Sequence, residues 1–595
     1  MHFENLSQIL TRSFLEIPDQ VSIVLQFSSL PDREITYREL FQASSGYAQN
    51  LADAGIGQGE VVILILNHGE DLIYAFFGTI LQGAIPSIMP FLNEKLSPDH
   101  YRSSLLSLVR ITAPTAIITY PEFVEEIHRA SQGTSVRAIL VTDQINRQST
   151  VDENTNPDEL PGLQSSPADI VLLQHSSGST GLQKGVALSH QAIINQLESY
   201  SQALHLNSSD VIVSWLPLYH DMGLIAGFIF PVLNRLLLIL MSPFDWVRAP
   251  FKLLQSITRY HATLCWLPNF AYNFSAQKIR DKDLVGIDLS SMRAIINCSE
   301  PIYNKSHEIF LERFKPYGLR LEALATSYAM AENVFAVTQG GIDAPVRVDV
   351  IDRQEFLLHQ IAKPIQKDAP ELVSATTEKD LENANWIKMV SSGKPIAGTR
   401  LKVLNSQGVE LPKRHIGEIA LNSNCMLNGY FNRPDLTEKA FLGGWYLTGD
   451  LGYQASGEVF ITGRKKDLII VGGKNIYPQD IEQLASEVKG VHPGRVVAFG
   501  VFNEQNGTED VVVIAESDLL EESTLAIDSH IANEVEHIAA EIRDKVTRNS
   551  DVALRYVHIV GKNWLLKTSS GKIARSSNHD KYLSELMQGD DYNLR

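Results

Sequence analysis

The chain has 595 residues and a formal net charge of −18, and 44% of its residues are hydrophobic. This length exceeds what one hydrophobic core usually supports, so two or more domains are expected. The strongly negative charge argues against sequence-independent binding of nucleic acid, which needs a basic surface.

The cysteines and the apolar runs indicate the cellular compartment in which the protein is expected. Cys265, Cys298 and Cys425 have no metal-like spacing, and such a sparse, odd set fits a reducing compartment. The stretch "MHFENLSQILTRSFLEIPDQ" has no basic segment followed by an apolar core, so no signal peptide is predicted. The most apolar runs, 61–66 and 236–241, are too short to cross a bilayer. We therefore expect a soluble, cytoplasmic protein without a transmembrane segment.

Helix and strand patterns alternate over most of the chain. Leu40, Tyr47 and Leu51 are spaced as on one helix face, and this pattern ends at Gly55. A further helix is predicted over 190–204. The runs that favour buried strands are 61–66, 116–120, 136–143, 169–174, 211–216, 236–241 and 292–298. This alternation predicts α/β units with largely buried sheets.

The pattern changes after residue 482. Two strands are predicted within 495–516, joined by a loop that carries Asn506 and Gly507, and another strand over 554–561. Between them, one apolar stripe predicts a helix through Ile531, Val535, Ile538, Ile542 and Val546. We place a boundary near Arg464–Asp467, which predicts a large N-terminal domain, 1–465, and a smaller α+β domain, 466–595.

Residues 175–185, "HSSGSTGLQKG", follow one of the predicted strands. A loop rich in glycine and hydroxyl residues offers N–H groups and hydroxyls to an anion. The spacing is not that of the Walker P-loop, because Gly181 and Lys184 are separated by two residues. A plain surface turn is the alternative. The composition favours a phosphate-binding loop that comprises Ser176, Ser177, Gly178, Ser179, Thr180, Gly181 and Lys184.

This loop and seven further segments resemble, in the same order, the signatures of the adenylate-forming superfamily. Its members include acyl-CoA synthetases, fatty acyl-AMP ligases, peptide-synthetase adenylation domains and luciferases. The segments are "WLPLYHDMGLIAG" (215–227), "CSEP" (298–301), "SYAMAE" (327–332), "GEIAL" (417–421), "YLTGDLG" (446–452), "ITGRKKDLIIVGGKNIYPQDIE" (461–482) and "KTSSGKIAR" (567–575). The resemblance implies a large multi-sheet N-terminal domain and a smaller, mobile C-terminal domain.

The resemblance also implies a reaction: a carboxylate attacks the α-phosphorus of ATP, giving an acyl-adenylate and pyrophosphate. Two anions meet, so positive charge and N–H donors are needed at the transition state. Lys572 would approach both anions, and His220 would meet the phosphates or the carboxylate. Thr180 and Glu332 would place Mg²⁺.

The nucleotide would be held by residues of several segments. Tyr328 would stack on adenine, while Asp450 and Arg464 would bind the ribose. The other residues that the resemblance assigns to ATP binding are Ser299, Glu300, Pro301, Ser327, Ala329 and Met330. Lys466 occupies the hinge position about which the small domain would rotate between two half-reactions, bringing Gly472 and Gly473 to the active site.

Several features resemble the fatty acyl-AMP ligases in particular. These are "WLPLYHDMGLI", "LPNFAYNF" (267–274) and "KNIYPQDIE", in which Ile476 replaces the usual histidine. About sixty residues separate Glu332 from Gly393, more than ordinary connections need. The ligases carry an insertion here that restrains the small domain and disfavours coenzyme A. We predict such an insertion at about 340–390; an ordinary surface excursion is the alternative.

The predicted function is activation of a fatty acid to acyl-AMP, then transfer to the phosphopantetheine thiol of an acyl carrier protein. An acyl-CoA synthetase is the first alternative. An amino-acid-activating domain is less favoured, because no carrier sequence follows the last motif. A non-catalytic relative that binds acyl-adenylate is opposed by the complete set of site residues.

The resemblance places Trp215, Met222, Trp266, Phe270, Cys298 and Ala329 around the acyl pocket. Three departures from the ligases add volume there: Ala329 replaces glycine, Cys298-Ser299 replaces Gly-Ala, and Trp266-Leu267 stands where two glycines are common. Close-packed interiors do not absorb such volume freely, so we expect a shortened or reshaped pocket for medium-chain or unusual acids. Alternatively, Trp266 turns away and fills core space.

Overall fold

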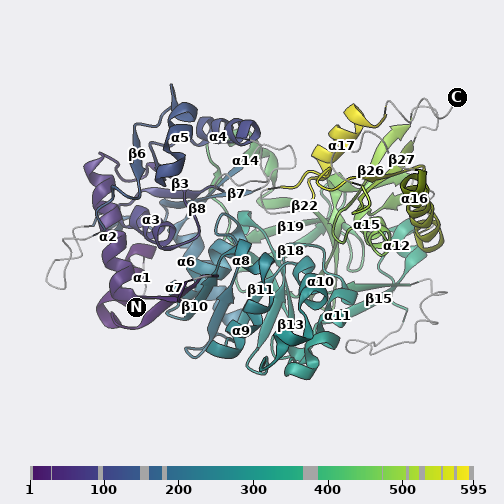
Figure 1. The fold of residues 1–595 in the computed structure, drawn as a ribbon, viewed down its shortest axis with the longest axis horizontal. Helices are drawn as coiled ribbons and strands as arrows, with labels where there is room; N and C mark the ends of the chain where they lie inside the picture. The colour runs from purple at the N-terminus through teal and green to yellow at the C-terminus, as the bar shows by residue number, and fades with distance from the viewer. Residues whose placement is uncertain are drawn as a thin grey trace.

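The computed structural model describes residues 4–28, 30–90, 98–147, 160–176, 184–365, 386–471, 474–503, 508–520, 529–550, 554–568 and 572–587. The N-terminal and central segments build the larger part of the molecule. The C-terminal segments gather at its other side, where Figure 1 shows β26 (Val496–Asn503), β27 (Thr508–Glu516), α16 (Ser529–Ser550) and α17 (Arg575–Glu585).

The largest sheet of the described residues has nine strands in the order β17-β14-β13-β12-β11-β9-β10-β1-β2. The strands from β13 to β1 run parallel, so their carboxyl ends lie at one edge, where ligands bind in open α/β sheets. Their bounds are β1 (Val21–Gln26), β2 (Arg33–Thr36), β9 (Val211–Ser214), β10 (Leu237–Met241), β11 (Leu264–Leu267), β12 (Ala294–Asn297), β13 (Leu324–Ala329), β14 (Ala336–Gly340) and β17 (Lys394–Pro395).

Along the chain, helices alternate with the strands of this sheet, and Figure 1 shows them around it. They are α1 (Leu6–Glu16), α6 (His190–Ala203), α7 (Phe230–Leu233), α8 (Pro243–Arg248), α9 (Phe251–Tyr260), α10 (Asn269–Lys278) and α11 (Asn304–Phe314), with a π-helix at Met222–Ile229. The predicted strand 211–216 ends at Ser214, so Trp215 lies beyond the carboxyl end of β9.

A second, four-stranded parallel sheet has the order β4-β3-β5-β6. Gly78 lets its helix α3 approach α2, because a Cβ there would lie 2.5 Å from the Tyr47 Cβ. The elements are β3 (Val61–Ile65), β4 (Ile85–Ile88), β5 (Ala116–Thr119), β6 (Ala138–Val141), α2 (Tyr37–Asp53), α3 (Glu70–Leu81), α4 (Pro98–Thr112) and α5 (Val124–Ser131).

Two smaller antiparallel sheets carry site residues. The strands β20-β8-β7 flank the predicted phosphate loop, and β18-β19-β22-β21, with β23 beside β22, carry the nucleotide residues. The elements are β7 (Ile170–Ser176), β8 (Lys184–Ser189), β18 (Thr399–Leu404), β19 (Gly417–Ser423), β20 (Gly429–Tyr430), α14 (Pro434–Ala440), β21 (Phe441–Leu442), β22 (Trp445–Ala455) and β23 (Glu458–Arg464).

The predicted insertion contains a β-hairpin-like pair with a helix. The run "VRVDVI" forms a strand as expected, β15, which pairs antiparallel with β16. The elements are β15 (Val348–Asp352), α12 (Arg353–His359) and β16 (Trp386–Val390).

The C-terminal elements have hydrophobic clusters of their own, built on both faces of the sheet β26-β27-β28. Arg575 ties them together: its guanidinium contacts Asp467 at 2.6 Å and Glu482 at 2.7 Å. The remaining elements are β24 (Ile469–Val471), β25 (Lys474–Ile476), α15 (Pro478–Ser486) and β28 (Tyr556–Val560).

The α/β fold with a smaller α+β part is confirmed, whereas the boundary at 465/466 stays a prediction. The predicted loop at Asn506 and Gly507 lies outside the described residues. Among those residues, none of the helices combines the length and apolar character that crossing a membrane requires.

Candidate active site

Lys572 reaches from the C-terminal segment to the carboxyl edge of the nine-stranded sheet. Its Nζ donates to the Ser299 carbonyl oxygen at 2.5 Å. Ser299 follows β12 with a φ of +69°, in the left-handed region that few residues other than glycine adopt. The Thr568 N–H donates to the Lys572 carbonyl at 2.8 Å, which ties the backbone of the lysine to that of Thr568. The central and C-terminal parts of the chain therefore meet at one positively charged group.

Two carboxyl groups share the surroundings of Lys572. Burial alone would raise the pKa of Asp221, but the hydrogen bond with His220 and the charge of Lys572 hold that pKa below its ordinary value. Desolvation raises the pKa of Glu300, with the Lys572 charge acting in the opposite direction. Glu300 Oε2 also accepts from the Phe270 N–H at 2.9 Å. Lys572 thus lies near the carboxyl groups of Asp221 and Glu300 at the sheet edge. A substrate carboxylate or a phosphate could take up the charge of the lysine in their place.

His220 and Asp221 are held by the π-helix that follows them. Asp221 Oδ1 accepts from the Met222 N–H at 2.9 Å and lies 3.8 Å from His220 Nδ1. Gly223 allows the close turn, because a Cβ there would lie 2.2 Å from the Pro217 carbonyl oxygen. Such π-turns occur often at functional sites. His220 and Lys572 thus both act on the charge of Asp221, and the role of His220 near the reacting anions stays a prediction.

Three of the predicted nucleotide residues form one connected group. Tyr328 Oη donates to Asp450 Oδ2 at 2.6 Å, and Arg464 Nε lies 3.2 Å from Asp450 Oδ1. Desolvation raises the pKa of Tyr328 well above its ordinary value, so the phenol stays protonated and can donate. Asp450 and Arg464 face each other because they are register partners in β22 and β23. This group is suited to binding sugar hydroxyls.

The neighbouring predicted residues differ in their surroundings. Ser327 is buried and donates to the Thr338 carbonyl at 2.8 Å, so its hydroxyl is engaged within the sheet. Ala329 ends β13, and the Met330 N–H donates to the Phe335 carbonyl at 2.9 Å. Pro301 is exposed.

Glu332 stands at a strained turn after β13. Val334 has φ +62° and ψ −58°, and the Phe335 N–H donates to the Asn333 carbonyl at 2.6 Å, which defines a γ-turn of the rare, strained form. A β-branched residue is a backbone outlier there. The Leu427 N–H holds the Glu332 carbonyl at 2.8 Å. Backbone strain of this kind clusters at active sites, where surrounding contacts maintain it.

Tyr430 connects Glu332 to the predicted phosphate loop. Its hydroxyl donates to Glu332 Oε1 at 2.9 Å and lies 3.0 Å from the Tyr446 hydroxyl. The ammonium group of Lys184 lies over the Tyr430 ring, 4.8 Å from its centroid. Sequence reasoning missed Tyr430, because the segment "LNGYFNRP" was not among the recognised motifs. The sequence signal that could have pointed to it is the pair Gly429-Tyr430. In the structure this pair forms the short strand β20 beside β8.

We predict that Tyr430→Phe lowers kcat/KM for ATP about tenfold, the usual scale for losing a hydrogen bond to a charged group. The ring that faces Lys184 would remain. The measurement is pyrophosphate release at varied ATP and Mg²⁺. Tyr453→Phe is the matched control, because the Tyr453 hydroxyl also donates to a carboxylate, Asp349, at 2.8 Å. Equal losses of kcat/KM in both variants would show a merely structural role for Tyr430.

The predicted acyl-pocket residues divide into two groups. Trp215 and Phe270 lie edge to face, with ring centroids 6.3 Å apart, and Met222 Sδ lies 3.8 Å from Ser299 Oγ. Trp266 instead donates from Nε1 to the Tyr200 hydroxyl at 2.8 Å and packs against Phe230. Its bulk therefore fills core space, as in the alternative considered above, and does not by itself shorten the pocket.

Cys298 lies directly before Ser299 and is fully buried, with Sγ 3.6 Å from the Ser299 hydroxyl. Burial raises the pKa of the Cys298 thiol to about 12.

Part of the predicted site lies outside the described residues. Ser176 ends β7 and Lys184 begins β8, on either side of the loop. Lys466 is exposed in the turn after β23, and its role as a hinge stays a prediction. The predicted residues without a description are Ser177, Gly178, Ser179, Thr180, Gly181, Gly472 and Gly473.

Several known proteins are similar to this chain over most of its length. The 4-hydroxyphenylalkanoate adenylyltransferase of Mycobacterium bovis is 31% identical over 549 residues, which cover 88% of this chain and 82% of that protein. The medium-chain fatty acid acyl-carrier-protein ligase JamA of Moorena producens is 30% identical, over 92% and 90% of the two chains. The crystal structure of fatty acid AMP ligase from Legionella pneumophila has a TM-score of 0.70 and 27% identity, over 98% and 96%.

Residues 16–431 match the family described as AMP-binding enzymes. Enzymes of this family use ATP, and the matched stretch includes Glu332, Tyr328 and the sheet edge that Lys572 contacts. Because the match spans well over half of the chain, the protein belongs to the family of AMP-binding enzymes.

Proposed function

We propose that the protein activates a fatty or related carboxylic acid with ATP and then loads the acyl group onto an acyl carrier protein. The observation that carries the first step is the contact of Lys572 with Ser299 at the carboxyl edge of β12. Two relatives support the acid class by their names, one an adenylyltransferase of 4-hydroxyphenylalkanoates and one a medium-chain fatty acid ligase.

In the first step, a carboxylate oxygen forms a bond to the α-phosphorus of ATP while the bond to pyrophosphate breaks. Lys572 supplies a compact positive charge where the two anions meet. Tyr328, Asp450 and Arg464 hold the nucleoside, and His220 stands beside the reacting groups. Positioning of both reactants accounts for much of the acceleration in reactions of this kind.

The surroundings of Glu332 fit Mg²⁺. Desolvation raises the pKa of Glu332, so a cation beside it would stabilise the ionised form. Among the described residues no cluster of three or more His, Cys, Asp or Glu side chains could hold a metal. Glu332 and Thr180, the residues that the family resemblance assigns to the ion, would supply the protein ligands, and phosphates and water the others, as Mg²⁺ prefers. The ion would neutralise charge between phosphate oxygens.

The insertion favours a carrier protein over free coenzyme A as the acceptor. Phe356 of α12 is buried, and its ring centroid lies 5.3 Å from that of Tyr477, which precedes α15 in the C-terminal part. On its other side, the insertion is anchored by Asp349, which lies 2.9 Å from Arg414 and accepts from Tyr453. This double attachment would resist rotation of the C-terminal part, which the coenzyme A reaction needs.

The test compares acceptors after adenylation. The protein is incubated with ATP, Mg²⁺ and labelled C6 to C18 acids, then with coenzyme A or with a phosphopantetheinylated carrier protein. Acyl-AMP that transfers to the carrier alone is the expected result. Rapid acyl-CoA formation would make the protein an acyl-CoA synthetase instead, and no adenylate with any acid would contradict the first step.

We predict that Phe356→Ser raises the rate of acyl-CoA formation several-fold, because it removes buried apolar contact with Tyr477 while adenylation remains. The measurement is the ratio of acyl-CoA to acyl-AMP over time. Leu358→Ser is the matched control on the same helix, since the Leu358 side chain is 52% exposed. A ratio that is unchanged in Phe356→Ser would refute the restraint.

A further inference from the structure

Two stacked tryptophans carry indole N–H groups without acceptors. The rings of Trp215 and Trp246 are parallel within 3°, with centroids 3.7 Å apart. Trp215 is 4% exposed and Trp246 is 0% exposed. Neither Nε1 has a hydrogen-bond partner among the described residues. A buried donor without an acceptor is costly, and native proteins satisfy nearly all such donors.

The pair lies on a continuous path along the carboxyl edge of the nine-stranded sheet. Ser299 follows β12 and contacts Lys572, and Phe270 follows β11 next to it, tied by its N–H to Glu300. The Phe270 ring lies 6.3 Å from Trp215 and 6.1 Å from Trp246, edge to face with both. Trp215 follows β9, the next strand in the sheet. An acyl chain that runs sideways from the reacting carboxyl group would therefore meet these indoles.

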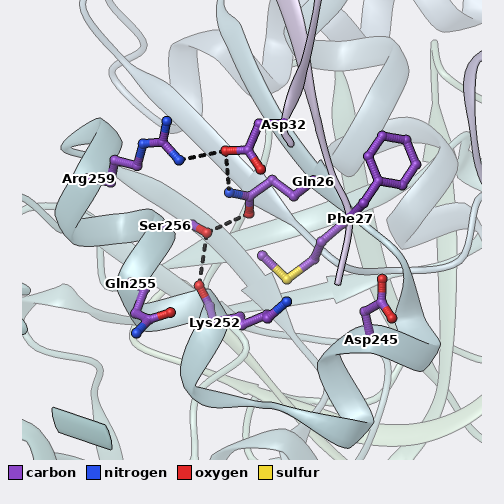
Figure 2. Close-up of a pocket in the computed structure, with 9 residues that line it drawn as sticks. Gln26, Phe27, Asp32, Asp245, Lys252, Gln255, Ser256 and Arg259 are labelled. Carbon is purple, nitrogen blue, oxygen red and sulfur yellow. Dashed lines mark hydrogen bonds and ion pairs between the residues drawn. The ribbon is translucent and has the colours of Figure 1, made fainter. Parts of the chain in front are cut away.

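A cavity of about 360 Å³ continues the same edge beyond the tryptophans, at the lower end of the usual size of ligand pockets. It lies where β10 and β1 end at the paired residues Met241 and Gln26. Asp245, the neighbour of Trp246 on α8, lines it together with Lys252 of α9 (Figure 2). Trp246 is thus joined to Trp215 by stacking and to the cavity lining through its chain neighbour Asp245.

The cavity is lined by polar and apolar side chains, and several of the polar ones are paired with one another. Figure 2 shows the pairs Arg259–Asp32, at 2.7 Å, and Ser256–Gln26, at 2.5 Å. Lys252 Nζ donates to a backbone carbonyl at 3.3 Å. Phe27 and Met241 in the same lining offer apolar contact to a short hydrocarbon tail, beside these paired polar groups.

We propose that the acid substrate carries a ketone, ether or hydroxyl oxygen partway along its chain, and that this oxygen accepts from the indole N–H groups of Trp215 and Trp246. The inference rests on the proposed function and narrows its substrate class to oxygenated medium-chain acids. The tail beyond the oxygen enters the cavity next to Asp245 and Lys252. A plain alkyl chain would leave both buried N–H donors without an acceptor, so an acid that supplies the oxygen is preferred over it.

The test uses a ten-carbon series in which one ketone is moved stepwise along the chain, with decanoic acid as the reference. The measurement is kcat/KM for acid-dependent pyrophosphate release by the full-length protein. At one ketone position we expect kcat/KM to exceed that of decanoic acid by about tenfold or more. Trp246→Phe keeps a stacked ring without the N–H, and the ratio between that ketone and decanoic acid should fall several-fold.

Trp266→Phe is the matched control, because the Trp266 N–H already has its acceptor on Tyr200. Its preference for the ketone should equal that of the unchanged protein. Decanoic acid used as well as every ketone would overturn the inference and leave the proposed function standing, even if Trp246→Phe did not fold. A ketone preference that survives Trp246→Phe would also overturn it. Failure to adenylate any acid would instead contradict the proposed function.

Discussion

Replacing Lys572 by alanine is expected to lower the rate of acyl-adenylate formation about 10²- to 10³-fold, the scale for removing one preorganised group that stabilises transition-state charge. Lys572 touches the sheet edge through its ammonium group, so the variant removes the charge from the point where carboxylate and α-phosphate would meet. Transfer of the acyl group from added, chemically made acyl-AMP should fall much less, because no second anion approaches in that step. Pyrophosphate release and thioester formation measure the two steps separately.

Lys489→Ala is the matched control for that experiment, because Lys489 is an exposed lysine of the same C-terminal part. It removes an equal charge and should leave both steps unchanged. Losses of equal size in adenylation and in transfer from acyl-AMP would show that Lys572 acts through folding or docking, and would argue against its role in the first step.

The second large effect is expected for Glu332→Gln, with adenylation reduced by about 10²-fold at ordinary Mg²⁺ concentration. The amide can still accept from Tyr430, so the hydrogen bond of 2.9 Å can persist while the negative charge is lost. Added Mg²⁺ should recover part of the activity, because the variant weakens binding of the ion. The measurement is a Mg²⁺ titration of pyrophosphate release at saturating ATP.

Glu438→Gln on α14 removes an exposed carboxylate and serves as the control. Its Mg²⁺ dependence should match that of the unchanged protein. If the Glu332→Gln defect were the same at every Mg²⁺ concentration, the carboxylate would not be acting through the ion.

The alternation of apolar runs was enough to predict the α/β fold, because parallel strands that are buried on both faces read as continuous apolar segments. Each of the predicted strands ends within a few residues of the observed one, and 211–216 is typical: β9 stops at Ser214. The antiparallel attachments of β2, β14 and β17 were not predicted. Their register depends on contacts with distant strands and not on local pattern.

Candidate site residues could be located from the sequence where one motif carries one charged residue, as with Lys572, Glu332 and Asp450, whose roles stay predictions. Site residues were harder to predict where their role depends on how side chains pack. Trp266 was assigned to the acyl pocket from its place in the chain, yet its indole is drawn to Tyr200 by a hydrogen bond across the core. Trp246 and Tyr430 were missed, because their contacts to Trp215 and Glu332 join segments far apart in sequence.

The burial of Cys298 has a consequence for an enzyme that makes an acylating agent. An acyl-adenylate is a mixed anhydride, which any thiolate nearby could intercept, and Cys298 lies one residue from the contact of Lys572. Only the ionised thiolate is a strong nucleophile, and burial raises the pKa of Cys298 to about 12 and that of Cys425 to about 11. Near neutral pH both thiols stay protonated. The activated acyl group is thereby kept from self-acylation and reserved for the incoming acceptor.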